Sequence, residues 1–291
     1  MNTENTTYCS PEDNCCATDD KCTTESQADT VRNNVRNAYS KVAEANNNGD
    51  GCGVESSCCG VSDDADINTL ISTRLGYSEA DLASVPDGAD MGLGCGNPRA
   101  IASLKAGEVV VDLGSGGGFD AFLAAQEVGD SGRVIGIDMT PEMLSKARNN
   151  AVKGKFTNVE FRLGEIEYLP IANDSVDVII SNCVINLSPN KAQVFSDAFR
   201  ALKPGGRLAI SDIVASTELP EEAKQDMQLH SACISGASTV SELEQMMSAA
   251  GFSDIRIQPK DDSKHFIKDW APGSNMEEYV LSASIEAIKP V

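Results

Sequence analysis

The sequence lacks any segment suited to a membrane or to export. No apolar run approaches the roughly 20 residues that a membrane-spanning helix requires. The N-terminus, MNTENTTYCSPEDNCC, has neither the basic nor the apolar region of a signal peptide. We therefore expect a cytoplasmic protein with no membrane partner.

Positive charge is also scarce. The chain has 23 lysines and arginines against 44 aspartates and glutamates, which gives a net charge of −21. Such a surface repels phosphate backbones, so we expect no nucleic-acid partner. Histidine is rarer still, with only His230 and His265, and this leaves few candidates for a general base.

Cysteine is too infrequent for a fold built on disulfides, with ten residues in a chain of 291. Without an export signal we expect these cysteines to be reduced thiols. Most lie near the N-terminus, where the spacing C-x5-C-C occurs twice, and this repeat is either an inert tail or a thiol site for a soft ligand. The N-terminal cysteines are Cys9, Cys15, Cys16, Cys22, Cys52, Cys58 and Cys59.

From residue 105 the chain alternates short β-branched runs with helix-sized spacers. This pattern is typical of βαβ units and a parallel sheet. We predict an α/β fold with a Rossmann-like sheet of seven strands and helices on both faces. The predicted strands are EVVVDLG, RVIGID, NVEFRLG, SVDVIIS, GRLAIS, DIRIQP and YVLSASIEAI.

The same patterns divide the chain into four parts. We predict a polar, Cys-rich, flexible tail at 1–28 and an N-terminal helix with a Cys-containing cap at 29–104. A cofactor-binding core covers 105–258, and within it 213–250 is longer than a crossover helix needs, which indicates a substrate-side insertion. Residues 259–291 then complete the sheet.

A glycine-rich turn follows the first predicted strand, in VVVDLGSGGGFDAF. Glycines let a turn approach a ligand closely, and the next helix offers free N–H groups at its start. The dinucleotide fingerprint would need glycine at position 119, where this chain has Phe119. The turn instead matches the D-x-G-x-G-x-G loop of S-adenosylmethionine-dependent methyltransferases.

Two acidic residues support this cofactor. Asp138 ends the second predicted strand, where a carboxylate can accept both ribose hydroxyls, and Glu165 follows the third strand, where the chain can face adenine. Ligands of open α/β sheets bind beyond the carboxyl ends of the strands. The predicted cofactor-binding residues are Asp112, Gly114, Ser115, Gly116, Gly118, Asp138, Met139, Glu165, Ile166 and Asn182.

Cys183 ends the fourth predicted strand, in SNCVINLSP, beside the expected position of the methyl group. Methyl transfer to oxygen or nitrogen needs a nearby base, and this segment has none. Cys183 taken alone is either a buried apolar filler or a ligand for a soft, thiophilic acceptor.

Several segments together resemble the arsenite methyltransferases from about residue 29 to the C-terminus. MGLGCGNP and ISNCVINLSP are the most specific, and VVVDLGSGGGFD, VIGIDMTPEML, FRLGEIEYLP, LKPGGRLAISDI, ACISGAS and FIKDWAPGS agree with them. The resemblance implies that Cys183 and Cys233 bind trivalent arsenic beside the methyl donor. It also implies that Cys95 and an N-terminal cysteine take part; we favour Cys52, with Cys58 and Cys59 as alternatives.

The resemblance further implies the partners of the reaction. The acceptors would be arsenite and methylated trivalent arsenicals, no tightly bound metal is expected, and a disulfide formed during turnover would be reopened by a thioredoxin-type or small-thiol reductant. Two other functions stay open: a C- or O-methyltransferase of the quinone-biosynthesis type, and a thiol-rich protein that binds metalloids or zinc.

Overall fold

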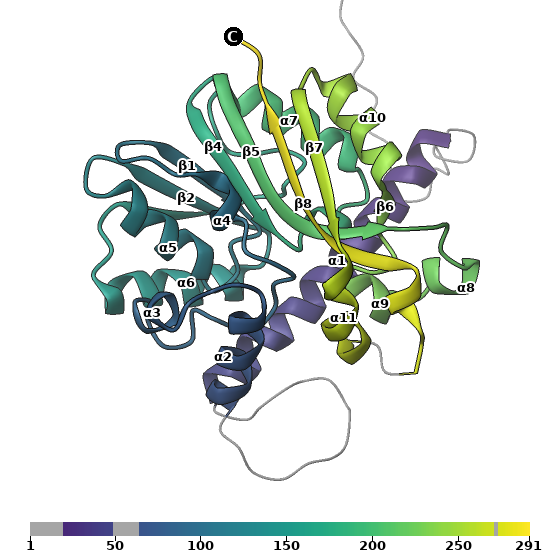
Figure 1. Ribbon diagram of the computed structural model, residues 1–291, viewed down its shortest axis with the longest axis horizontal. Coiled ribbons are helices and arrows are strands. Elements are labelled where there is room, and N and C mark those ends of the chain that lie inside the picture. Colours follow the sequence, from purple (N-terminus) through teal and green to yellow (C-terminus); the bar gives the residue numbers. More distant parts are fainter. Residues whose placement is uncertain (1–19, 49–63, 271–272) are drawn as a thin grey trace, which may run out of the picture.

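A computed structural model describes residues 20–48, 64–270 and 273–291 (Figure 1). The expectations for Cys9, Cys15, Cys16, Cys52, Cys58 and Cys59 lie outside the described residues, and so does the side chain of Cys22. Within the described part of the chain, no helix is both long and apolar enough to cross a membrane.

One mixed sheet forms the centre of the molecule, with the strand order β3-β2-β1-β4-β5-β8-β7. The strands from β3 to β5 are parallel to their neighbours, whereas β8 is antiparallel to both β5 and β7. This confirms the predicted fold class, and the two-residue strand β6, paired with β5, is additional. The strands are β1 Val109–Leu113, β2 Arg133–Asp138, β3 Val159–Leu163, β4 Val176–Asn182, β5 Leu202–Ala215, β6 Ser238–Thr239, β7 Ser253–Lys260 and β8 Val280–Ile288.

Helices cover both faces of the sheet because alternate strand residues point to opposite sides. Val110 and Val134 pack with Phe122 on the face covered by α4 (Arg99–Ala102), α5 (Phe119–Val128) and α6 (Pro141–Gly154). Val111 and Ile135 belong to the core of the other face, which α7 (Lys191–Ala201) and α10 (Val240–Ala250) cover. Both faces are therefore apolar, which explains the continuous hydrophobic strands.

The remaining elements lie outside the sheet. They are α1 Asp20–Asn48, α2 Asp64–Arg74, α3 Glu79–Ala83, η1 Ile185–Leu187, α8 Glu221–Lys224, α9 Met227–Ser231, η2 Asp261–Ser263, α11 Lys264–Trp270 and η3 Met276–Glu278.

Three element boundaries differ from the prediction. Helix α1 begins at Asp20, so residues 20–28 are helical rather than part of the tail. Helix α10 is the crossover helix before β7, which leaves 216–239 as the inserted stretch. Strand β7 continues to Lys260 instead of ending at 258. The first turns of α1 consist mostly of polar residues, so the apolar periodicity that predicts helices gave no signal there.

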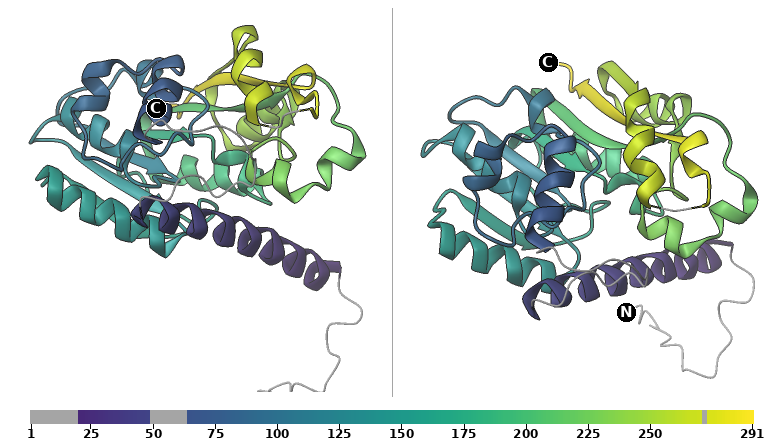
Figure 2. Two further views of the ribbon diagram at one scale, coloured as in Figure 1. Left: turned by 90° about the horizontal axis from the view of Figure 1, so that it is seen from below. Right: turned by 60° about the horizontal axis from the view of Figure 1, so that its bottom comes forward.

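Helix α1 lies along one side of the molecule, next to α6 (Figure 2). Ser40 Oγ donates to Glu142 on α6 (2.8 Å), and Arg36 Nε donates to the carbonyl of Met139 (3.3 Å). Further along, the Tyr39 hydroxyl donates to the carbonyl of Ser231 on α9 (3.3 Å). The helix therefore connects the end of β2 with the inserted stretch.

We predict that Phe122→Ala lowers the free energy of unfolding by about 3–5 kcal/mol, measured by urea denaturation. Phe122 is fully buried and packs against the rings of Phe156 and Phe161, so the truncation leaves a cavity between helix and sheet. Val152→Ala, at an 80% exposed position on α6, is the control and should stay within about 0.5 kcal/mol. Equal effects of the two substitutions would contradict this core assignment.

Candidate active site

The turn between β1 and α5 forms an open cradle. Gly114, Gly116 and Gly118 all have positive φ (68°, 49° and 95°), which glycine adopts without strain. A Cβ on Gly114 would lie 2.3 Å from Cγ2 of Val184, whereas a Cβ on Gly116 would meet nothing within 4 Å. The hydroxyl of Ser115 is buried and has no partner among the described residues. The turn can therefore receive a ligand that hydrogen-bonds to it.

Asp138 sits at the end of β2, beside this turn. Its carboxylate accepts hydrogen bonds from the backbone N–H groups of Gly116 (3.0 Å) and Thr140 (2.8 Å). Burial raises the pKa of Asp138, and burial together with Asp120 and Asp138 raises the pKa of Asp112 well above its usual value. Asp138 thus offers a desolvated carboxylate to hydroxyl donors. A pocket opens at this turn, and Gly114, Asp112 and Asp138 all line it.

Glu165 has a different environment from the one expected. Its carboxylate forms ion pairs with Arg32 (3.3 Å) and Arg36 (3.7 Å) of α1. Its neighbours Ile166 and Glu167 line the pocket, but Glu165 does not. Sequence analysis did not predict the two arginines as partners of Glu165, because helix α1 is more than a hundred residues away along the chain.

Three cysteines from separate parts of the chain meet beside the cradle. Cys95 precedes α4, Cys183 follows β4 and Cys233 follows α9, and all three are buried free thiols. Cys95 Sγ, Cys183 Sγ and a carboxylate oxygen of Asp212 lie within 4.8 Å of one another. The Cys233 thiol donates to the carbonyl of Cys183 (2.8 Å). The described part of the chain therefore places the three predicted core cysteines at one site.

Two of these cysteines have unusual backbone geometry. Cys183 (φ 59°) and Cys233 (φ 63°) adopt the left-handed conformation that non-glycine residues rarely occupy. Such strain concentrates at functional sites.

The surroundings of two of these thiols disfavour their ionised form. Hydrogen bonds with Cys233 and Cys95, together with burial, raise the pKa of Cys183 well above its usual value. Burial raises the pKa of Cys95. A soft, thiophilic element could replace the thiol protons and bind the sulfurs as its ligands.

A polar network that the sequence did not indicate holds the Cys95 segment in place. Asn182 accepts a hydrogen bond from the Cys95 N–H (3.0 Å) and donates to the Gly96 carbonyl (2.8 Å) and to Asp120 (3.1 Å). The Tyr77 hydroxyl donates to Asp120 (2.6 Å). Asn182, predicted to contact the cofactor, lines the pocket and also anchors Cys95. Asn182 is the member of this network that sequence analysis identified; the roles of Tyr77 and Asp120 were not predicted.

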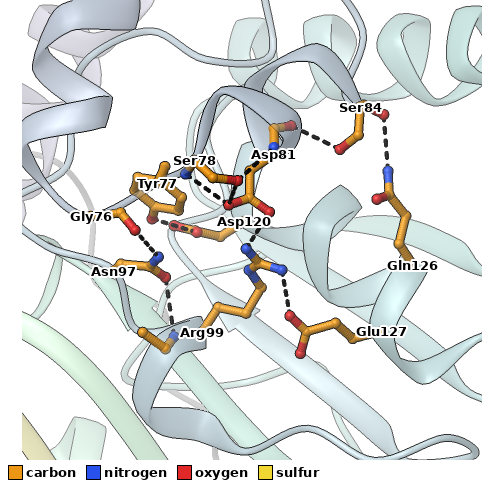
Figure 3. Close-up of polar contacts among 11 residues, drawn as sticks. Gly76, Tyr77, Ser78, Asp81, Ser84, Asn97, Arg99, Asp120, Gln126 and Glu127 are labelled. Carbon is orange, nitrogen blue, oxygen red and sulfur yellow. Dashed lines mark hydrogen bonds and ion pairs between the residues drawn. The ribbon is translucent and has the colours of Figure 1, made fainter.

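Figure 3 shows how this network continues across the cap that precedes β1. Tyr77 points at Asp120 on α5, and Arg99 lies between Asp81 and Glu127 and forms ion pairs with both. The cap is therefore fixed to α5 by buried and half-buried polar contacts.

Asp212 and Asn186 organise the other side of the thiol site. Asp212 accepts hydrogen bonds from the N–H groups of Ile185 (2.8 Å) and Ile213 (2.7 Å) and from the Asn186 amide (3.0 Å). The same Asn186 amide donates to the carbonyl of Cys233 (3.3 Å). Burial raises the pKa of Asp212 to about 6. Both residues lie within the quoted segments ISNCVINLSP and LKPGGRLAISDI, but sequence analysis assigned them no role, because their contacts with the thiol site form only in the folded chain.

The sheet order, the glycine turn and Asp138 define a class I S-adenosylmethionine-dependent methyltransferase. A methyltransferase-domain family model accordingly matches residues 104–251. An arsenite methyltransferase of Halobacterium salinarum is 52% identical over 267 residues, which cover 89% of this chain and 67% of that protein. The chain belongs to the arsenite methyltransferase family.

Two further comparisons agree with this family. A crystal structure of an arsenic(III) S-adenosylmethionine methyltransferase from Chlamydomonas reinhardtii superposes with a TM-score of 0.56 at 32% identity, covering 76% of this chain and 73% of that one. The human arsenite methyltransferase is 42% identical over 157 residues, or 51% of this chain. This match spans only 42% of the human protein's length.

We predict that Tyr77→Phe destabilises the protein by about 1–3 kcal/mol, because the buried Asp120 loses a hydrogen-bond donor. Urea denaturation measures the loss. The control is Tyr168→Phe, since Tyr168 is 63% exposed. A Tyr77→Phe protein as stable as the control would show that the network contributes nothing to attaching the cap.

We also predict that iodoacetamide modifies Cys183 at least about tenfold more slowly in the folded protein than in urea at pH 8, as measured by peptide mass spectrometry. The raised pKa keeps Cys183 protonated, so its rate should keep rising as the pH increases from 7 to 9.5. Burial with an ordinary pKa would slow the reaction but would let the rate level off near pH 9. A folded-state rate that levels off below pH 9 would contradict the raised pKa.

Proposed function

We propose that the protein transfers methyl groups from S-adenosylmethionine to trivalent arsenic held by the thiolates of Cys95, Cys183 and Cys233. One observation carries this proposal: Cys183 lines the same pocket as Gly114 and Asp138. The thiol site and the cofactor cradle are therefore open to each other.

The residues of the cradle fit this cofactor. The unpartnered Ser115 hydroxyl and the open space at Gly116 can receive polar groups of the ligand. The Asp138 carboxylate can accept the ribose hydroxyls. When bound, the cofactor supplies an electrophilic methyl group on a sulfonium.

The thiol site suits arsenic as the acceptor. Three thiols displace the hydroxyl groups of arsenous acid, each As–S bond replacing an As–O bond, and each thiol proton leaves in a water molecule. Trivalent arsenic then keeps its lone pair, which forms the As–C bond as the methyl–sulfonium bond breaks. Holding arsenic at a fixed position beside the methyl group supplies the proximity that the reaction needs. No proton leaves arsenic, so no general base is required.

The electron balance supports the proposed thiol reductant. Methylation formally oxidises arsenic by two electrons, and two cysteines can return them by forming a disulfide. We propose that Cys95 forms this disulfide with Cys52, or with Cys58 or Cys59, all three of which lie outside the described residues. A thioredoxin-type protein or a small thiol would reopen it.

The remaining proposals follow from the same chemistry. Arsenite and methylated trivalent arsenicals are the substrates, and no tightly bound metal cofactor takes part. We propose a cytoplasmic location, because free thiols persist in a reducing compartment. The quinone-type alternative is disfavoured, since among the described residues the pocket is lined by the Cys183 thiol and by no histidine.

We predict that Cys183→Ser and Cys233→Ser each lower the rate of arsenite methylation by at least about a hundredfold, because two sulfurs hold arsenic less firmly and place it less accurately. Chromatography of methylated arsenicals measures the rate. Cofactor affinity of Cys233→Ser, measured by calorimetry, should stay within about twofold of wild type, because Cys233 does not line the cofactor pocket. Tyr168→Phe, at an exposed site, is the activity control.

Wild-type methylation by either cysteine variant would contradict the proposed arsenic site. Loss of cofactor binding together with activity would instead show that the substitution damages the pocket as a whole.

A further inference from the structure

The thiol site contains a carboxylate that arsenic chemistry does not use. Asp212 is 1% exposed, and one of its oxygens lies within 4.8 Å of both Cys95 Sγ and Cys183 Sγ. The thiol of Cys233 lies outside this group of three but next to it, because it donates to the Cys183 carbonyl and hydrogen-bonds to the Cys183 thiol. Two sulfurs and one oxygen therefore meet in a buried space, and the Cys233 sulfur is close enough to Cys183 to turn toward them.

We propose that Cys95, Cys183, Cys233 and Asp212 form a four-ligand site for a thiophilic divalent cation, Zn²⁺ or Cd²⁺. Zinc takes cysteine sulfur and aspartate oxygen as ligands and prefers four of them in a tetrahedron. Trivalent arsenic takes three sulfurs and keeps a lone pair in the fourth direction. The divalent cation would therefore use the Asp212 carboxylate as its fourth ligand, whereas arsenic would bind the same sulfurs without it.

The hydrogen bonds of Asp212 leave it able to act as a ligand. A carboxylate has about four lone-pair sites, and Asp212 uses three of them, toward Ile185, Asn186 and Ile213. These fixed donors orient the carboxylate, as outer partners of metal ligands commonly do. The backbone N–H of Asn186 also faces the carboxylate, so a bound cation would replace this fourth contact.

The binding reaction balances without a redox partner. The three thiols release three protons, and the Asp212 carboxylate binds as the anion. The resulting centre has the same charge as a four-cysteine zinc site, which proteins hold routinely. Binding should therefore strengthen as the pH rises, because protons are products.

A bound cation would occupy the sulfurs that arsenic needs, so zinc or cadmium would inhibit methylation in competition with arsenite. This consequence rests on the proposed function. The cation site itself does not, since it follows from the positions of Cys95, Cys183 and Asp212, with Cys233 beside Cys183.

Cadmium titration tests the site, followed by the ultraviolet sulfur-to-cadmium charge-transfer band. The protein used is the full chain with serine at its seven N-terminal cysteines, Cys9 to Cys59, so that only the site's thiols remain. We expect one Cd²⁺ per chain, and Asp212→Asn should weaken the affinity by about a hundredfold, because even outer partners of metal ligands contribute about 10–100-fold.

Two controls accompany the titration. Asp197→Asn removes a buried carboxylate that contacts Leu169 and Arg200 instead of the thiols, and its cadmium affinity should match the parent. Asp212→Asn should still bind arsenite within about threefold, which shows that the thiols stay in place. Equal cadmium affinity with and without the Asp212 carboxylate would overturn the proposal.

X-ray absorption of the zinc-loaded parent protein tests the same site without altering Asp212. We expect three sulfurs at about 2.3 Å and one oxygen at about 2.0–2.2 Å. A shell with no more than two sulfurs would overturn the proposal even if Asp212→Asn fails to fold. Methylation is measured on the chain with all its cysteines. Cadmium binding to the site, with no arsenite methylation by that chain, would support the site and contradict the proposed function. Arsenite methylation by that chain, with cadmium binding that does not depend on Asp212, would support the proposed function and contradict the site.

Discussion

Close packing between Gly114 and Val184 is the constraint on which the rest of the site depends. Strands β1 and β4 are neighbours, with Leu113 paired to Ser181, so the turns that follow them must share a small space. Val184 occupies the position where a side chain on residue 114 would be. Because that side chain is absent, the cofactor cradle and the Cys183 turn can lie in contact.

The two asparagines flanking Cys183 extend this arrangement to the other cysteines. Asn182 binds the backbone of Cys95, and Asn186 binds the backbone of Cys233. A single segment after β4 therefore fixes three thiols that enter from different parts of the chain. Buried polar groups in such a network are costly to leave unpaired, so the network specifies one geometry.

Helix α1 closes the site from the remaining side, and its attachment is mainly apolar. Its arginines pair with Glu165 at distances of 3.3 and 3.7 Å, and partly exposed ion pairs contribute little. Val35 and Ala43 are fully buried, and Tyr39 packs with the cluster that contains the thiols. Burial of this apolar face, rather than the ion pairs, therefore holds the helix against the rest of the protein.

The sequence by itself determined the sheet, the glycine turn and the acidic end of β2, because hydrophobic periodicity and turn chemistry act over short distances. It also identified Cys183 and Cys233, through local motifs. Tyr77, Asp120, Asn186 and Asp212 became part of the site only in the tertiary structure, as did the ion pairs of Glu165. Their roles depend on contacts between segments far apart in the chain, and a local pattern carries no record of such contacts.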